Sequence, residues 1–134
     1  MNAKHYVSLE AAKKLKEINH DGLNYEMHIG DDGIIYPAYV VGDVYPCPAL
    51  LEAMDWLESN GIHIEIRMYS SKVKGDPFKI AEDDEYQWKW YFSICKGDDV
   101  EHPILEDSKD EYVVMHEDRY ECMNAAIEKA LGLL

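Results

Sequence analysis

The sequence has few basic side chains, and this scarcity limits the partners that it can bind. It contains 13 lysines and arginines against 27 aspartates and glutamates, a formal net charge of −14 over 134 residues. A nucleic-acid groove needs clustered lysine and arginine, and an anionic membrane surface attracts the same residue types. The composition therefore disfavours direct binding to nucleic acid or to a membrane.

Long apolar runs and a cysteine framework are also missing. No apolar stretch approaches the ~20 residues that span a bilayer, and the first ten residues lack the apolar segment of a secretion signal. The three cysteines, Cys47, Cys95 and Cys122, are an odd, sparse set in apolar surroundings, which is typical of reduced thiols in a protein core. We therefore expect a cytoplasmic protein.

The sequence carries no recognisable catalytic or metal-binding motif. None of the six histidines is followed or preceded by a histidine or cysteine at the spacing of local zinc ligands. His63-Ile64-Glu65 matches half of the zinc deaminase signature, but Pro46-Cys47 comes before it and lacks the second cysteine. Acidic runs such as Asp31-Asp32 do not place their carboxylates at alternate positions around a glycine, as a calcium-binding loop does. Ser70-Ser71 has no recognisable general base that would make a serine nucleophilic. The sequence thus predicts no catalytic residue, metal or cofactor, and it favours a protein that is not an enzyme.

Apolar residues make up 47% of the chain, enough for a core, and their periodicity predicts three helices. These helices are expected at about 9–19, 48–59 and 119–132, where apolar side chains recur every three to four residues. Ser8 can cap the first helix. Asp118 can cap the last one, with a glutamate three residues later completing a capping box.

Strict alternation of apolar and polar residues predicts two strong strands, at 62–69 and 87–95. Trp88, with the tryptophan and phenylalanine that follow it at alternate positions, is expected to enter the core. Two weaker strands, at 25–29 and 34–41, flank Gly30-Asp31-Asp32-Gly33, whose residues tolerate the positive φ of a hairpin turn.

The connections complete the expected architecture. Residues 70–86 and 96–111 are polar and acidic and are expected to be loops, with a short strand at about 112–115. Pro37 cannot donate a ladder hydrogen bond, so it is expected at a sheet edge or a bulge. Adjacent strands with short connections pair antiparallel, and helices cover the apolar face that remains. The sequence therefore predicts one α+β domain over residues 1–134, a single antiparallel sheet of four to five strands with three helices largely on one face, in the order α-β-β-α-β-β-(β)-α.

Three blocks of the sequence carry a resemblance to a known group of proteins. They are Val7-Ser8-Leu9-Glu10-Ala11-Ala12-Lys13-Lys14-Leu15-Lys16, then Leu50-Leu51-Glu52-Ala53-Met54-Asp55-Trp56-Leu57 running into Ile62-His63-Ile64-Glu65-Ile66, and finally Tyr120-Glu121 with Ala125-Ala126 and Ala130-Leu131. With these blocks the chain resembles small uncharacterised proteins of gut anaerobic bacteria and their phages, over nearly its whole length. The group has no assigned activity, so the resemblance implies a bacterial or mobile-element context and no site residues.

Two sets of side chains are candidates for binding. If the strands at 62–69 and 87–95 pair, their polar faces form one surface with aromatic and basic character, the kind that stacks ligands or docks proteins. Its candidate residues are His63, Arg67, Tyr69, Lys89 and Tyr91. The second set is an acidic surface that would meet a basic partner, with candidates Asp83, Asp84, Glu85, Asp98 and Asp99. Each set has a simpler interpretation. The strand face can be an ordinary sheet face that is half exposed to solvent, and the acidic charge can serve only solubility.

The leading functional hypothesis is a small, non-catalytic accessory protein that binds a protein partner, for which a basic protein is one candidate. One alternative is an inhibitor that mimics DNA and occupies the basic cleft of a nucleic-acid enzyme. A second is a small-molecule-binding protein or enzyme with a pocket between sheet and helices, built from His28, His63, Arg67 and Tyr69. A third alternative is a homodimer made by pairing edge strands.

Overall fold

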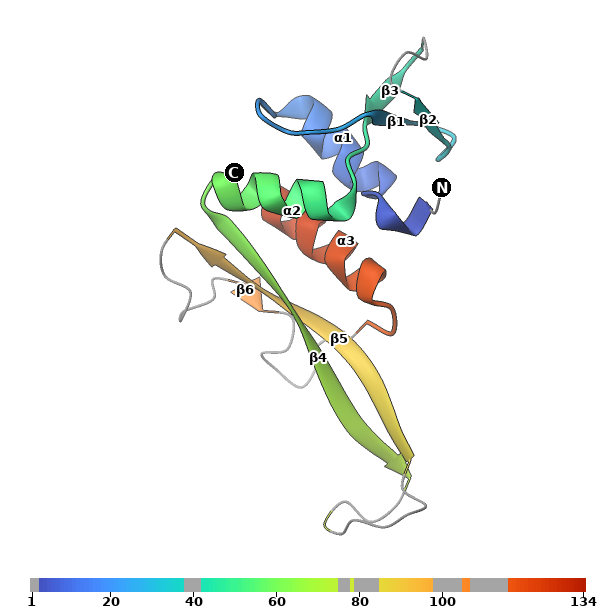
Figure 1. Ribbon diagram of the computed structural model, residues 1–134, viewed down its shortest axis with the longest axis vertical. Helices are drawn as coiled ribbons and strands as arrows, with labels where there is room; N and C mark the ends of the chain where they lie inside the picture. The colour runs from blue at the N-terminus through green and yellow to red at the C-terminus, as the bar shows by residue number, and fades with distance from the viewer. Residues whose placement is uncertain (1–2, 38–41, 75–77, 79–84, 98–104, 107–115) are drawn as a thin grey trace.

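The computed structural model describes residues 3–37, 42–74, 78, 85–97, 105–106 and 116–134. Two antiparallel sheets lie on opposite sides of a group of helices (Figure 1). Helix α1 (Leu9–Glu17) contacts one sheet, and helices α2 (Leu50–Ser59) and α3 (Arg119–Leu131) contact the other. The helices also pack on one another, since α3 contacts both α1 and α2.

The three expected helices and the α+β class are confirmed. The Ser8 side chain accepts a hydrogen bond from the Ala11 N–H at the start of α1, after a 3-10 turn at Ala3–His5. The Asp118 carboxylate accepts from the N–H groups of Tyr120 and Glu121 at the start of α3. Both caps satisfy donors that a first helical turn leaves unpaired.

The first sheet has the strand order β2-β1-β3, with β1 (Met27–Gly30), β2 (Ile35–Pro37) and β3 (Val44–Pro46). The expected turn joins β1 to β2: the Gly33 N–H donates to the Gly30 carbonyl at 2.9 Å, and Gly33 has a φ of +77°. Strand β2 is at the sheet edge and ends at Pro37, so the missing N–H of this proline interrupts no ladder.

The second sheet is dominated by a long two-stranded ribbon of β4 (Ile62–Lys74) and β5 (Glu85–Lys96), with the short strand β6 (Leu105–Glu106) beyond β5. The ribbon continues well past the ends of the helices (Figure 1). The prediction of a loop at 70–86 is wrong at both ends, because residues 70–74 belong to β4 and residues 85–86 to β5. Cross-strand hydrogen bonds hold these polar residues extended, so side-chain polarity does not mark where the strand ends.

Two further predictions need correction. Residues 105–106 form strand β6 inside a segment expected to be a loop, while the strand expected at 112–115 lies outside the described residues. The expected single sheet is two sheets, because the helices stand between β1–β3 and β4–β6 and each sheet turns its own apolar side to them.

One apolar core joins all the layers. Its largest fully buried side chains come from α1, α2, β4, β5 and α3: Leu15, Leu57, Ile62, Phe92 and Ile127. The three cysteines are free and buried, which confirms them as core residues. Trp88, also expected in the core, is 57% exposed, because it lies on the part of the ribbon that extends beyond the helices.

Candidate binding surfaces

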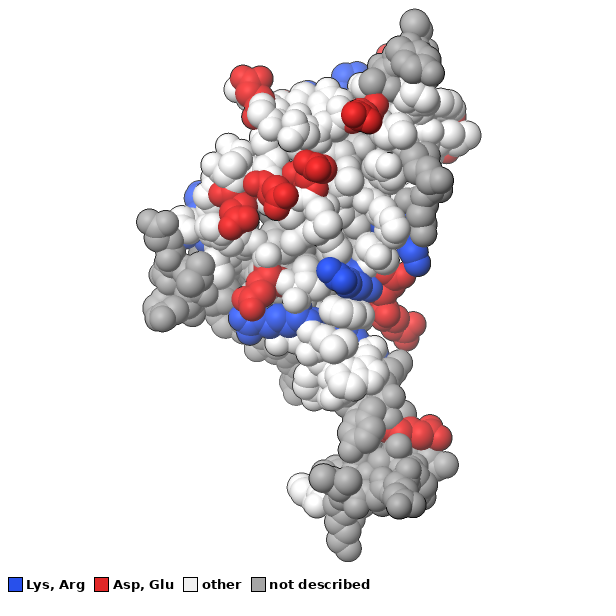
Figure 2. Space-filling view, viewed as in Figure 1, with Lys and Arg blue, Asp and Glu red and all other residues white. Residues whose placement is uncertain are grey.

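Helix α2 has one face in the core and the opposite face in solvent. Trp56 and Leu57 are buried on the core side, whereas Glu52, Asp55 and Glu58 are all exposed. Residues three apart are neighbours on a helix surface, about 4.5 Å apart along the axis. The three carboxylates therefore form a slanting row, and Figure 2 shows acidic side chains gathered over α2.

Three shallow hollows follow this row of carboxylates. The first, of about 240 Å³, is lined by Glu26 and Glu52, and the second, of about 190 Å³, by Glu52 and Asp55. The third, of about 130 Å³, is lined by Asp55 and Glu58 and also by His63. Neighbouring hollows share a lining carboxylate, so they follow one another along α2. No lysine or arginine is among the residues that line them.

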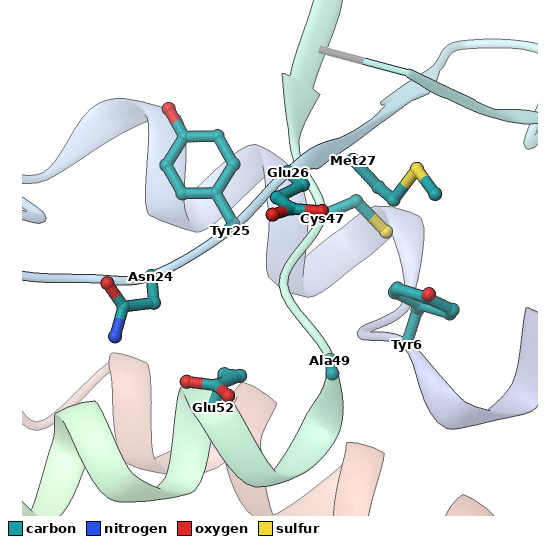
Figure 3. Close-up of a pocket in the computed structure, with 8 residues that line it drawn as sticks. All are labelled: Tyr6, Asn24, Tyr25, Glu26, Met27, Cys47, Ala49 and Glu52. Atoms are coloured by element: carbon teal, nitrogen blue, oxygen red, sulfur yellow. The ribbon is translucent and has the colours of Figure 1, made fainter.

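Figure 3 shows the first hollow, between α2 and the chain that leads into β1. Asn24 points toward α2, whereas the ring of Tyr25 points away from it. The buried Cys47 thiol donates to the Val7 carbonyl at 3.6 Å, and burial raises the pKa of Cys47 to about 12. The thiol is therefore neutral near pH 7 and is unsuited to act as a nucleophile, so the charge of this hollow comes from its two glutamates.

The predicted strand-face residues lie largely together. The register places Arg67 opposite Tyr91 and Tyr69 opposite Lys89, so these four side chains share the face of the ribbon that the helices do not cover. His63 is on the same face nearer α2, with its Nδ1 atom 3.5 Å from the Glu58 carboxylate. A role of these residues in binding stays a prediction.

Electrostatic contacts order part of this face. The Arg67 guanidinium donates to the Glu65 carboxylate at 2.7 Å. This bond lowers the pKa of Glu65, and hydrogen bonds to Glu65 and then to Tyr91 raise the pKa of Arg67. Both charges are thus held ionised on the solvent-exposed side of β4.

The remaining predicted residues divide into those that are described and those that are not. Glu85 begins β5 and is exposed, while Asp83, Asp84, Asp98 and Asp99 lie outside the described residues. The pocket proposed from four side chains is not assembled. His28 belongs to β1, whereas the other three, His63, Arg67 and Tyr69, belong to β4 on the far side of the helices.

Sequence reasoning missed the acidic row of α2. The signal was available, because Glu52, Asp55 and Glu58 recur every three residues on the polar side of an amphipathic helix. What the sequence alone did not provide was Glu26, which the fold brings from the chain before β1 to the same hollow as Glu52.

No protein-family model, curated protein or solved structure matches this chain. The resemblance to small bacterial and phage proteins therefore stays a prediction. Among the helices of the described part, none is long and apolar enough to cross a membrane. The same described residues contain no group of three or more His, Cys, Asp or Glu arranged to hold a metal ion.

Proposed function

We propose that the protein is a non-catalytic binding module of the cytoplasm that docks a basic segment of a partner protein on the exposed side of α2. The observation that carries this proposal is the series of three hollows lined by four carboxylates, Glu26, Glu52, Asp55 and Glu58, with no lysine or arginine in their linings. A bacterial or phage accessory role, as the sequence resemblance implies, is part of the same proposal.

The chemistry of the hollows suits lysine and arginine side chains. Each of these side chains has an apolar stem and a cationic end, and Leu51 and Met54 offer apolar surface beside the carboxylates of the third hollow. An exposed ion pair typically contributes only ~0.2–1 kcal/mol, so a single contact would not hold a partner. A segment with several basic residues would engage the whole row, and the row would also speed its association at low salt.

The test compares two variants with the same change in charge. Glu52→Gln, Asp55→Asn and Glu58→Gln are combined in one variant. The matched control combines Glu10→Gln, Glu17→Gln and Glu117→Gln, which are exposed acids away from the hollows. Binding of a fluorescent peptide rich in arginine and lysine is measured by anisotropy, alongside an uncharged peptide of the same length.

We expect the α2 variant to bind the basic peptide at least about tenfold more weakly than the wild type, and the control variant to bind it as the wild type does. Binding should also weaken as ionic strength rises from about 0.01 to about 0.15 M, over which the Debye length falls from ~30 to ~8 Å. Equal weakening in both variants would show attraction by overall charge alone and would overturn the proposal, as would unchanged binding in the α2 variant.

A further inference from the structure

The apolar face of the β4–β5 ribbon is longer than the helical layer that covers it. Next to the helices, Phe92 and Ile94 are 1% and 0% exposed, and Ile66 is half-buried. Further along the same face, Met68 is 52% exposed and Trp88 is 57% exposed. The sheet thus presents large apolar side chains to solvent on the face that its inner half uses for the core.

The backbone of β4 also has an edge with which no other described strand pairs. Trp90 exchanges two hydrogen bonds with His116, its N–H donating at 2.7 Å and its carbonyl accepting at 2.8 Å. In an antiparallel ladder, the backbone N–H and C=O of one residue point to the same side of the strand. Trp90 therefore directs its N–H and C=O away from β4. Its cross-strand partner, Met68, therefore directs its own N–H and C=O away from β5, to the outer edge of β4.

Backbone orientation alternates from residue to residue, so the orientation of Met68 is shared by every second residue of β4. The even-numbered residues Ile62, Ile64, Ile66, Met68 and Ser70 have the same orientation as Met68, since the register of the pairing is regular up to Lys72. Strand β4 is at the edge of its sheet, and within the described part of the chain no other strand pairs with this edge. As far as the described residues go, a row of backbone donors and acceptors is therefore open to another strand.

Two copies of β4 can pair in a register that sets apolar residues opposite each other and acidic residues opposite basic ones. A two-fold axis at Ile66 places β4 antiparallel to β4 of a second copy, with Ile66 opposite Ile66 and Ile64 opposite Met68. The same axis places Glu65 opposite Arg67 twice. An axis at Glu65 or at Arg67 would instead set like charges opposite each other, which disfavours those registers.

We propose that β4 pairs with β4 of a second copy of this chain about Ile66, which joins the two ribbons into one sheet in the order β5-β4-β4-β5. The outward N–H and C=O groups of the even-numbered residues make the hydrogen bonds. Met68 of each copy packs beside Ile64 of the other on the apolar face. On the opposite face, the Glu65–Arg67 pair within each copy extends to a cluster of two carboxylates and two guanidinium groups. Ile64 also lines the third hollow beside the acidic row of α2, so the two surfaces adjoin. Their charged residues differ, however, since Glu65 and Arg67 line none of the three hollows, so each proposal is tested with its own variants and can fail alone.

The first test is charge reversal, read by sedimentation velocity of the full chain from about 1 to about 500 μM. We expect the wild type to dimerise with increasing concentration. Glu65→Arg sets two arginines opposite two arginines, and Arg67→Glu sets glutamates opposite glutamates, so each variant alone should dimerise at least about tenfold more weakly. An equimolar mixture of the two should form a heterodimer, because every facing pair is then again of opposite charge.

The second test needs no variant. Hydrogen exchange of the wild-type backbone amides is compared at dilute and concentrated protein. The amides of Ile64, Ile66 and Met68 should gain protection with concentration, while those of Glu65 and Arg67 are already bonded to β5 and should not. A wild type that stays monomeric to 500 μM, charge-reversed variants that dimerise normally, or a mixture that stays monomeric would each overturn the proposal. Unchanged exchange at the even-numbered amides of a dimer would also overturn it.

Discussion

Within the β4–β5 ribbon, the two halves of strand β5 have the same alternation of apolar and polar residues and differ in what covers them. In the inner half, α2 and α3 lie on the apolar face, and Phe92 is 1% exposed. In the outer half the helices have ended, and Trp88, at the same parity on the same strand, is 57% exposed. Alternation therefore determines which face of a strand is apolar, and the reach of the neighbouring helices determines whether that face is buried.

Paired truncations give the largest expected difference between the two halves. Phe92→Ala removes a fully buried ring and leaves a cavity, so we expect it to lower the free energy of unfolding by ~3–5 kcal/mol. Trp88→Ala removes a ring that is already mostly in solvent, and its cost should stay below ~1 kcal/mol. Urea denaturation at dilute protein, where self-association is negligible, measures both. Equal losses would contradict the difference in burial between the halves.

Helix α3, which covers the inner half of the ribbon, can be destabilised by a substitution outside the ribbon. Asp118→Ala removes the side-chain cap of α3 and leaves the N–H groups of Tyr120 and Glu121 to solvent. We expect a loss of ~0.5–2 kcal/mol in the free energy of unfolding. Glu117→Ala, a change at an exposed neighbour, is the control and should stay within ~0.5 kcal/mol of the wild type. A control that costs as much as Asp118→Ala would show that the cap is not the cause.

The smallest expected effect is a pH dependence on the uncovered face. The bond from Arg67 holds the pKa of Glu65 below its usual range, so this pair stabilises the fold fully above the unfolded pKa of glutamate. That stabilisation is lost as the pH falls through the lower, folded pKa. An NMR titration of the Glu65 carboxyl should show its midpoint shift upward in Arg67→Gln. An unchanged midpoint would mean that the two side chains do not interact in solution.

A parallel test lies in the turn between β1 and β2. The Tyr36 hydroxyl, and after it the Ile34 N–H, donate to the Asp32 carboxylate and lower the pKa of Asp32. The sign is the same as for Glu65, because a depressed folded pKa gives stabilisation at neutral pH that acid removes. Tyr36→Phe should raise the Asp32 midpoint, measured by the same titration, and leave that of Glu65 unchanged. A shift at both carboxyls would point to a general change of fold.

The sequence by itself determined the local structure of this protein. Apolar spacing identified three helices, Ser8 and Asp118 identified two of their starts, and alternation identified the cores of β4 and β5. These features follow from interactions between residues a few positions apart, such as caps and turns, or from the period of a single element. For that reason they can be predicted from the sequence alone.

Only the tertiary structure decided which of these local faces are covered. It separated the strands into two sheets, brought Glu26 beside Glu52, and carried β4 to Lys74, past the end of its helical cover. It also left the edge of β4 without a partner among the described strands. Burial depends on where each helix lies over the sheets, and that placement is set by packing between distant parts of the chain, which no local pattern encodes.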